Sequence, residues 1–124
     1  MFQISRERVF SASHQLREYK GKCERLHGHN WRIRVHLEAA ELDESGMVID
    51  FHDLDRIMAD ALEPYEHRHL NEVAPFDAIN PSAENLARNI CERMRERLRD
   101  ARVRVCRCDV WENDLSRARY TPES

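Results

Sequence analysis

The stretch HGHNWRIRVHL, residues 27–37, decides the fold that we expect for this chain. Apolar and polar side chains alternate along it, which is the pattern of a β-strand with one buried face. A strand that begins at His27 places His27 and His29 on the same face as Trp31 and the aliphatic residues that follow. Gly28 separates the two histidines and points the other way. Two imidazoles held side by side on a rigid strand form half of a metal site.

A third histidine comes from the N-terminal segment. Residues 2–13 read as a first strand, and His14 lies at or just past its end, where an antiparallel neighbour brings it level with the other two histidines. Three histidines without a nearby carboxylate suit zinc and leave one tetrahedral position open for water or substrate, as catalytic zinc sites do. Cys23 offers an alternative, because its sulfur as fourth ligand would close the site into a structural one.

The composition is that of a soluble globular protein. With 124 residues, of which 41% are apolar and 35% charged, the chain forms one domain (residues 1–124) with one modest core. No run approaches the roughly 20 apolar residues of a membrane span. The first residues carry no signal-peptide pattern, so we expect a cytoplasmic protein without membrane contact and with reduced cysteines. The net charge is −3, and acids interleave with the arginines of residues 92–100, so we expect no nucleic-acid partner.

The rest of the chain predicts an α+β fold. Residues 29–42 form the second long strand, 47–49 a short third strand, and 103–112 a last strand whose mixed parity indicates a bulge. Asp50 and Ser82 are the expected N-caps of two helices. Their apolar stripes recur at helical spacing: Leu54, Ile57, Met58, Ala61 and Leu62, then Leu86, Ile90, Met94 and Leu98. This order predicts an antiparallel sheet with helices on one face, and the other face, which carries arginine and histidine, needs partner subunits or water.

Three further groups of polar residues can do chemistry, and each has an ordinary surface role as its alternative. Glu66 beside His67 can fix the tautomer of the imidazole for acid–base work, or it is a chance pair in a chain with 23 acids. Glu112 can accept two N–H groups from a guanidine-like ligand edge, or it is a solvated strand end. The basic residues around Cys23 can favour its thiolate, or they form an ordinary basic loop.

Six stretches, taken together and in order, resemble the family of 6-pyruvoyl-tetrahydropterin and 6-carboxytetrahydropterin synthases. They are FSASH at 10–14, CERLHGHN at 23–30, GMVIDFHDL at 46–54, EHRHLN at 66–71, NPSAENLA at 80–87 and VWEN at 110–113. Each is weak alone, but together they span nearly the whole chain. The resemblance implies a tunnelling fold, in which a four-stranded antiparallel sheet carries two helices on one face. It also implies that subunits join their sheets into a β-barrel, typically as trimers that pair into hexamers.

The resemblance also implies the roles of the site residues. It implies that the metal is zinc, held by His14, His27 and His29. Cys23 is then the catalytic thiol instead of a ligand, and Glu112 anchors the amino-pyrimidinone edge of the pterin. Glu66 and His67 match the family's Asp-His pair, which assists proton transfer and is often supplied by a neighbouring subunit.

The spacing of Cys23 and His27 favours one branch of the family. Three residues separate them, which resembles the bacterial 6-carboxy branch of queuosine and deazapurine synthesis, whereas the pyruvoyl branch usually has a longer gap. The implied reaction converts 7,8-dihydroneopterin triphosphate to 6-carboxy-5,6,7,8-tetrahydropterin and releases acetaldehyde and triphosphate. The alternative within the family is the pyruvoyl-type elimination of triphosphate.

One residue departs from the family pattern. Glu66 stands where Asp is usual, and its extra methylene can displace His67, for which His69 is an alternative. If this change disables proton transfer, or if Cys23 closes the metal shell, the alternative of another class is a non-catalytic zinc or pterin-binding module.

Overall fold

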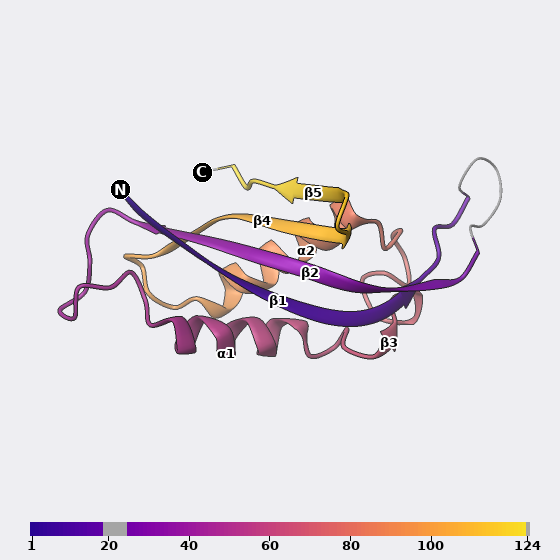
Figure 1. The fold of residues 1–124 in the computed structure, drawn as a ribbon, viewed down its shortest axis with the longest axis horizontal. Helices are drawn as coiled ribbons and strands as arrows, with labels where there is room; N and C mark the ends of the chain where they lie inside the picture. The colour runs from indigo at the N-terminus through magenta and orange to yellow at the C-terminus, as the bar shows by residue number, and fades with distance from the viewer. Residues whose placement is uncertain (19–24, 124) are drawn as a thin grey trace.

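The computed structural model describes residues 1–18 and 25–123. It is a twisted five-stranded sheet with two helices packed against one face (Figure 1). The strands, in the spatial order β3-β1-β2-β4-β5, are β3 (Arg68–His69), β1 (Phe2–His14), β2 (His27–Ala39), β4 (Arg104–Asn113) and β5 (Ser116–Tyr120). The helices are α1 (Phe51–Leu62) and α2 (Ala83–Arg97), and a short 3-10 helix spans Leu70–Glu72. None of the described helices is both long and apolar enough to cross a membrane.

Strands β1 and β2 form a long antiparallel hairpin without a register shift. Phe2 lies opposite Ala39 at one end, and His14 lies opposite His27 at the other. Along β2 the side chains of Trp31, Ile33, Val35 and Leu37 are fully buried, while those between them are more exposed or polar. The predicted alternation of this strand is therefore confirmed. We call the side of the sheet that carries these buried residues the covered face, and the opposite side the open face.

Both helices begin where their caps predict. The Asp50 carboxylate accepts a hydrogen bond from the His52 N–H at 2.7 Å, and the Ser82 hydroxyl accepts one from the Asn85 N–H at 3.1 Å. Each satisfies one of the backbone donors that a helix leaves unpaired at its N-terminus. The buried helix residues are Leu54, Met58, Ala61 and Leu62 in α1, and Leu86, Ala87, Ile90, Cys91 and Met94 in α2. Burying a large aliphatic side chain in this core contributes about 1.5–3 kcal/mol.

The predicted strands differ from the observed ones in three places. Residues 47–49 form no strand, and Val48 and Ile49 are bends, so that prediction is wrong, although Val48 is buried against the core. Of its apolar neighbours, Ile49 packs partly buried against the core and Met47 is exposed, and neither pairs in the sheet. The fourth antiparallel strand is instead β5, which pairs with β4. The two-residue β3, parallel to β1, is an addition at the sheet edge.

The bulge predicted in the last strand is confirmed and lies at Cys106. The residues on either side of Cys106 pair with Leu37 and His36, so Cys106 is an extra residue without a partner of its own in β2. A bulge of this kind shifts the alternation of side chains by one. Beyond it, Glu112 therefore faces the covered side of the sheet and Trp111 the open side.

Candidate functional site

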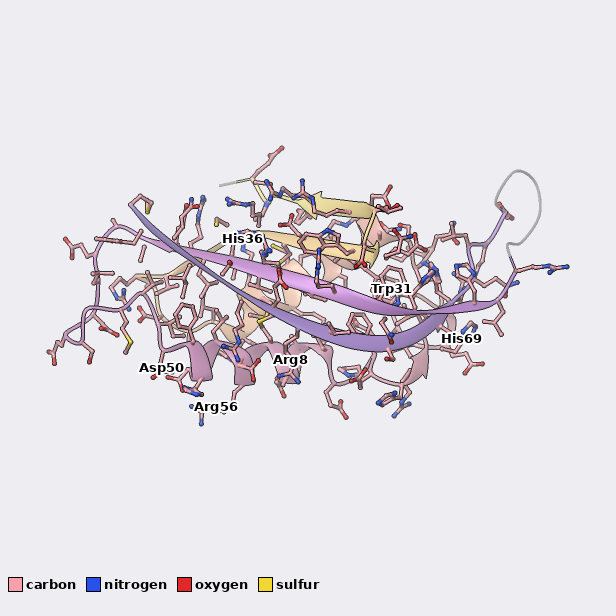
Figure 2. All side chains as sticks on the ribbon, viewed as in Figure 1. Arg8, Trp31, His36, Asp50, Arg56 and His69 are labelled. Atoms are coloured by element: carbon pink, nitrogen blue, oxygen red, sulfur yellow. The ribbon has the colours of Figure 1, made fainter. Side chains whose placement is uncertain are left out.

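Three histidines from two strands converge at one end of the covered face. His14 ends β1, and His27 and His29 begin β2. Because the hairpin register sets His14 opposite His27, their Nε2 atoms lie 3.0 Å apart. The ring centroids of the three imidazoles lie 4.6 to 5.1 Å from one another. Figure 2 shows Trp31, which packs under this cluster, toward the same end of the sheet as His69, with His36 further along β2.

Glu112 joins the three histidines. Its Oε1 lies 3.1 Å from Nε2 of His14, 3.1 Å from Nε2 of His29 and 3.9 Å from Nε2 of His27. The four candidate ligand atoms all lie within 4.8 Å of one another. Imidazole nitrogen and carboxylate oxygen are donors that a divalent metal such as zinc accepts in tetrahedral sites. The structure thus adds a carboxylate to a set that the sequence had indicated as histidine alone.

Backbone carbonyls fix the tautomers of two of these histidines. Nδ1 of His14 lies 2.8 Å from the Pro81 carbonyl oxygen, and Nδ1 of His27 lies 2.7 Å from that of Arg25. A carbonyl can only accept, so each Nδ1 carries a proton and each Nε2 turns a lone pair toward the cluster. Two lone pairs at 3.0 Å repel unless a cation, either a proton or a metal ion, lies between them. The donor set therefore fits a bound metal ion.

The cluster has a closed floor and an open rim. The side chain of His14 is 2% exposed, whereas those of His29, Glu112 and His27 are 20%, 31% and 34% exposed. Trp31 packs edge-on against His14 and His29, with ring centroids 4.9 and 5.2 Å away. A ligand can therefore approach from the rim while the floor stays fixed by the hydrophobic core.

Two asparagines hold the chain that leaves His14. The Asn71 amide donates to the Gln15 carbonyl and accepts from the Gln15 N–H, at 2.6 and 2.9 Å. The Asn80 amide makes the same pair of bonds with Arg17, at 3.1 and 2.7 Å. The Arg17 guanidinium also donates to three backbone carbonyls of the 71–79 segment. The segment that supplies the carbonyl partner of His14 is thus tied to the end of β1.

A cavity of about 320 Å³ adjoins the cluster through Glu112. Its lining residues come from the first turn of α2 and from β5: Ala83, Glu84, Glu112, Ser116, Arg117, Ala118 and Arg119. Glu84 is a second carboxylate at this cavity, and sequence reasoning missed it. An acid in the first turn of a helix has an ordinary explanation in the helix dipole, so local sequence carried no signal for it beyond its place in the NPSAENLA stretch.

The predicted Glu66–His67 pair lies at the outer edge of β1, next to β3. The Glu66 carboxylate accepts from the Ser11 N–H at 2.7 Å, and the His67 N–H donates to the Ser11 carbonyl at 2.7 Å. His67 adopts a left-handed backbone (φ 57°), and its side chain is 79% exposed. Its Nε2 lies 3.9 Å from Glu66 Oε1, which is too long for a hydrogen bond. Neither residue belongs to the four whose ligand atoms converge.

The remaining predicted residues are His69 and Cys23. His69 donates to or accepts from the Ser13 hydroxyl at 3.0 Å, on the open face. Cys23, with the two lysines beside it, falls in residues 19–24, outside the described residues. Its role as thiol or as metal ligand stays a prediction.

Comparison with known proteins first defines the class. The structure of the Caenorhabditis elegans 6-pyruvoyl tetrahydropterin synthase has this fold, with a TM-score of 0.84, 24% identity, and coverage of 98% of this chain and 96% of that one. The family model for 6-pyruvoyl tetrahydropterin synthase matches residues 3–123. The chain belongs to this family of enzymes, as the six stretches predicted.

Two relatives carry a narrower name within the family. The 6-carboxy-5,6,7,8-tetrahydropterin synthase of Synechocystis sp. is 35% identical over 103 residues, which cover 77% of each chain. The enzyme of the same name from Haemophilus influenzae is 30% identical over 143 residues, which cover 97% of this chain and 99% of that one. The likeness therefore extends over nearly the whole length of a 6-carboxy synthase.

Proposed function

We propose that this chain, as one domain over residues 1–124, is a zinc-dependent carbon–carbon lyase of queuosine and 7-deazapurine biosynthesis. It converts 7,8-dihydroneopterin triphosphate and water to 6-carboxy-5,6,7,8-tetrahydropterin and releases acetaldehyde and triphosphate. The observation that carries the proposal is the convergence of three imidazoles and one carboxylate at an accessible rim. The names of the two relatives and the three-residue gap before His27 support the 6-carboxy product.

The three histidines hold the zinc in this proposal: His14, His27 and His29. When bound, zinc supplies Lewis acidity that polarises the oxygens of the substrate side chain. The carbonyls of Pro81 and Arg25 keep the Nδ1 protons in place, so the ligating nitrogens stay available.

Glu112 anchors the pterin in this proposal. It lies where the cluster meets the cavity that Glu84 also lines, so its carboxylate can turn from the histidines toward a ligand in the cavity. A guanidine-like amino-pyrimidinone edge offers two parallel N–H donors, which a carboxylate accepts well. When Glu112 makes those bonds, its place beside the histidines is left for substrate oxygen. Holding the ring in this way contributes by orientation.

Proton transfer is assigned to three side chains. Cys23 takes the proton from the substrate carbon as general base. His67, steadied by Glu66, carries protons to and from the side-chain oxygens. Its exposed ring supports a role in the site of a neighbouring subunit. The proposal therefore includes a homo-oligomer, a trimer or hexamer, in the cytoplasm.

The proposal is tested by incubating the zinc-loaded protein with 7,8-dihydroneopterin triphosphate and analysing the products by mass spectrometry with an acetaldehyde assay. The expected result is 6-carboxy-5,6,7,8-tetrahydropterin with acetaldehyde. A 6-pyruvoyl product would instead assign the triphosphate elimination, and the absence of turnover with zinc bound would assign a binding module. Glu112→Gln should raise KM strongly, while Glu92→Gln, an exposed glutamate of α2, should leave it unchanged.

The role of Cys23 is tested separately. Turnover should be lost in Cys23→Ala while zinc binding is retained. In the cobalt-substituted protein, a sulfur-to-cobalt charge-transfer absorption that vanishes in Cys23→Ala would show that the thiol is a ligand, and the closed structural site would then replace the catalytic one.

A further inference from the structure

The open face carries rows of charged side chains that the proposed reaction does not use. In one row, the balanced row, positive and negative side chains pair with one another. The Asp109 carboxylate accepts from the Arg119 guanidinium at 2.6 and 3.1 Å and from His36 Nε2 at 2.8 Å. Arg34, its neighbour in β2, pairs with Glu7 across the hairpin at 2.8 Å. Every cation of this row therefore has an acid.

The next row has cations and no acid. The register brings Arg32 and Arg117 to either side of Trp111. Their guanidinium carbons lie 4.0 and 5.9 Å from the indole centroid, and that of Arg34 lies 5.3 Å away. Within the described residues, neither Arg32 nor Arg117 has a carboxylate within 4 Å. One indole thus gathers three cations, of which only one has an acidic partner.

Two arginine donors on this face are buried without an acceptor. Within the described part of the chain, the Nε atoms of Arg32 and Arg107 are out of contact with solvent and have no hydrogen-bond partner. Buried N–H groups in folded proteins nearly always have an acceptor, so the orphaned Nε of Arg32, beside Trp111, points to a ligand that brings one. Both lie on the open face, Arg32 within the acid-free row and Arg107 on the far side of the balanced row.

The local charge is opposite to that of the chain. We define the arginine patch as Trp111 with the three arginines that contact it (Arg32, Arg34 and Arg117) and two further arginines of the open face (Arg107 and Arg119). Two carboxylates, Glu7 and Asp109, accompany these five cations, whereas the whole chain has a net charge of −3. A positive patch on an acidic protein attracts anions to one place.

We propose that the arginine patch binds a small oligophosphate of the tripolyphosphate type. The planar guanidinium presents paired N–H donors that match phosphate oxygens, which makes arginine better suited than lysine to this anion. The ligand is short, because Glu7 and Asp109 interrupt the cations and would repel a long polyanion. A nucleic acid is disfavoured as well, since Arg32 already covers the indole on which a base would stack. This site stands on the open face alone and does not depend on the proposed reaction.

The test is a calorimetric titration of inorganic tripolyphosphate into the full-length protein, first metal-free and then zinc-loaded, so that capture by the metal is recognised. Loss of two guanidinium–phosphate contacts in Arg32→Gln/Arg117→Gln should weaken binding about tenfold or more. The matched control is Arg88→Gln, because Arg88 is an exposed arginine of α2 whose partner is the neutral Asn85. Equal affinity in the double variant, or an equal loss in the control, would overturn the proposal.

Further measurements identify the ligand and keep the proposal testable if the double variant does not fold. If the double variant unfolds, Arg117→Gln alone, at an exposed position, should still weaken binding about threefold, and Arg117→Lys should restore part of it. ATP should compete about as well as tripolyphosphate, because the phosphate chain is what the patch recognises. Much tighter binding of ATP, or of a single-stranded oligonucleotide that the same variant abolishes, would overturn the assignment of a small oligophosphate.

Discussion

The covered face and the open face are built by the same strands, yet they gather opposite chemical groups. On the covered face, three imidazoles and the Glu112 carboxylate turn lone pairs toward one point. On the open face, guanidinium N–H groups surround Trp111. The first arrangement calls for a cation and the second for an anion. Because side chains alternate along a strand, β2 alone contributes to both, with His29 on one face and Arg32 on the other.

The two faces also differ in how their polar groups are held. Two histidines of the covered face, His14 and His27, are fixed by backbone carbonyls, which no side-chain substitution removes. The charges of the open face are fixed by other side chains, chiefly the fully buried Asp109. We therefore expect the metal centre to fail only when a ligand is removed, and the open face to respond to its partners and to pH.

The largest expected effect is on the covered face. His29→Ala removes one of the converging ligands and should weaken zinc affinity more than about 100-fold, measured by competition with a chromophoric chelator. The matched control is His52→Ala on α1, whose side chain is 93% exposed. Tripolyphosphate affinity should stay unchanged in both variants. Retained zinc affinity in His29→Ala would break the comparison, because the covered face would then not be the metal centre.

The next effect tests the open face. Asp109→Asn leaves the His36 N–H and the Arg119 guanidinium with a weaker acceptor in a fully buried position, and should lower the free energy of unfolding by about 2–3 kcal/mol. Urea denaturation measures this. Asp114→Asn, at an exposed turn, is the control. The same change frees Arg119, so tripolyphosphate should bind more tightly to Asp109→Asn, and weaker binding would contradict the arginine patch.

A smaller effect connects the second helix to the metal centre. Ser82→Ala removes the N-cap of α2 and should cost about 1 kcal/mol of stability in the same assay. Ser82 follows Pro81, whose carbonyl orients His14, so zinc affinity should fall slightly too. Ser45→Ala, in an exposed turn, provides the comparison. Unchanged stability in Ser82→Ala would mean that packing alone fixes this end of the helix.

The smallest effect is a pH dependence that belongs to the open face. Burial lowers the pKa of His36 below its ordinary value of 6.5; the hydrogen bond to Asp109 opposes this, and the charges of Arg107 and Arg119 add to it. The unfolded chain therefore binds a proton at His36 before the folded chain does. The stability from neutral His36 is complete above pH 6.5 and is lost as the pH falls below it.

This dependence can be isolated by substitution. Comparing urea denaturation at about pH 7 and about pH 5, His36→Gln should lose less stability than the parent protein, while His52→Gln should behave like the parent. Equal slopes in all three proteins would show that His36 titrates like an exposed imidazole.

Local sequence carried much of this architecture. The alternation around Trp31 predicted which face His27 and His29 share, and the caps Asp50 and Ser82 predicted where both helices begin. These features depend on neighbours within a few residues, so periodicity and hydrogen-bonding chemistry reveal them. The convergence of His14 with them needed only the hairpin register.

The features that escaped sequence reasoning depend on distant partners. Strand β5 reads Ser-Arg-Ala-Arg-Tyr, and nothing in its polarity distinguishes it from a charged tail until β4 is present to pair with it. Residues 47–49 have the apolar composition of a strand but find no partner in the sheet. The approach of Glu112 to the histidines depends on where the bulge lies in β4. The irregular alternation of apolar residues in this strand predicted a bulge but did not reveal its position.

The bulge lies at Cys106, a residue that performs no chemistry in the site. Side chains alternate along a strand, so one extra residue would turn every later side chain to the opposite face, and the bulge at Cys106 prevents this. If Cys106 paired with β2 as an ordinary strand residue instead of bulging, the two halves of the strand could not both keep their apolar side chains inward. Either Val103 and Val105 would leave the core, or Glu112 would leave the histidines and Trp111 would replace it. The chemistry of the metal centre therefore depends on the bulge that absorbs Cys106 as much as on the identity of the residues around it.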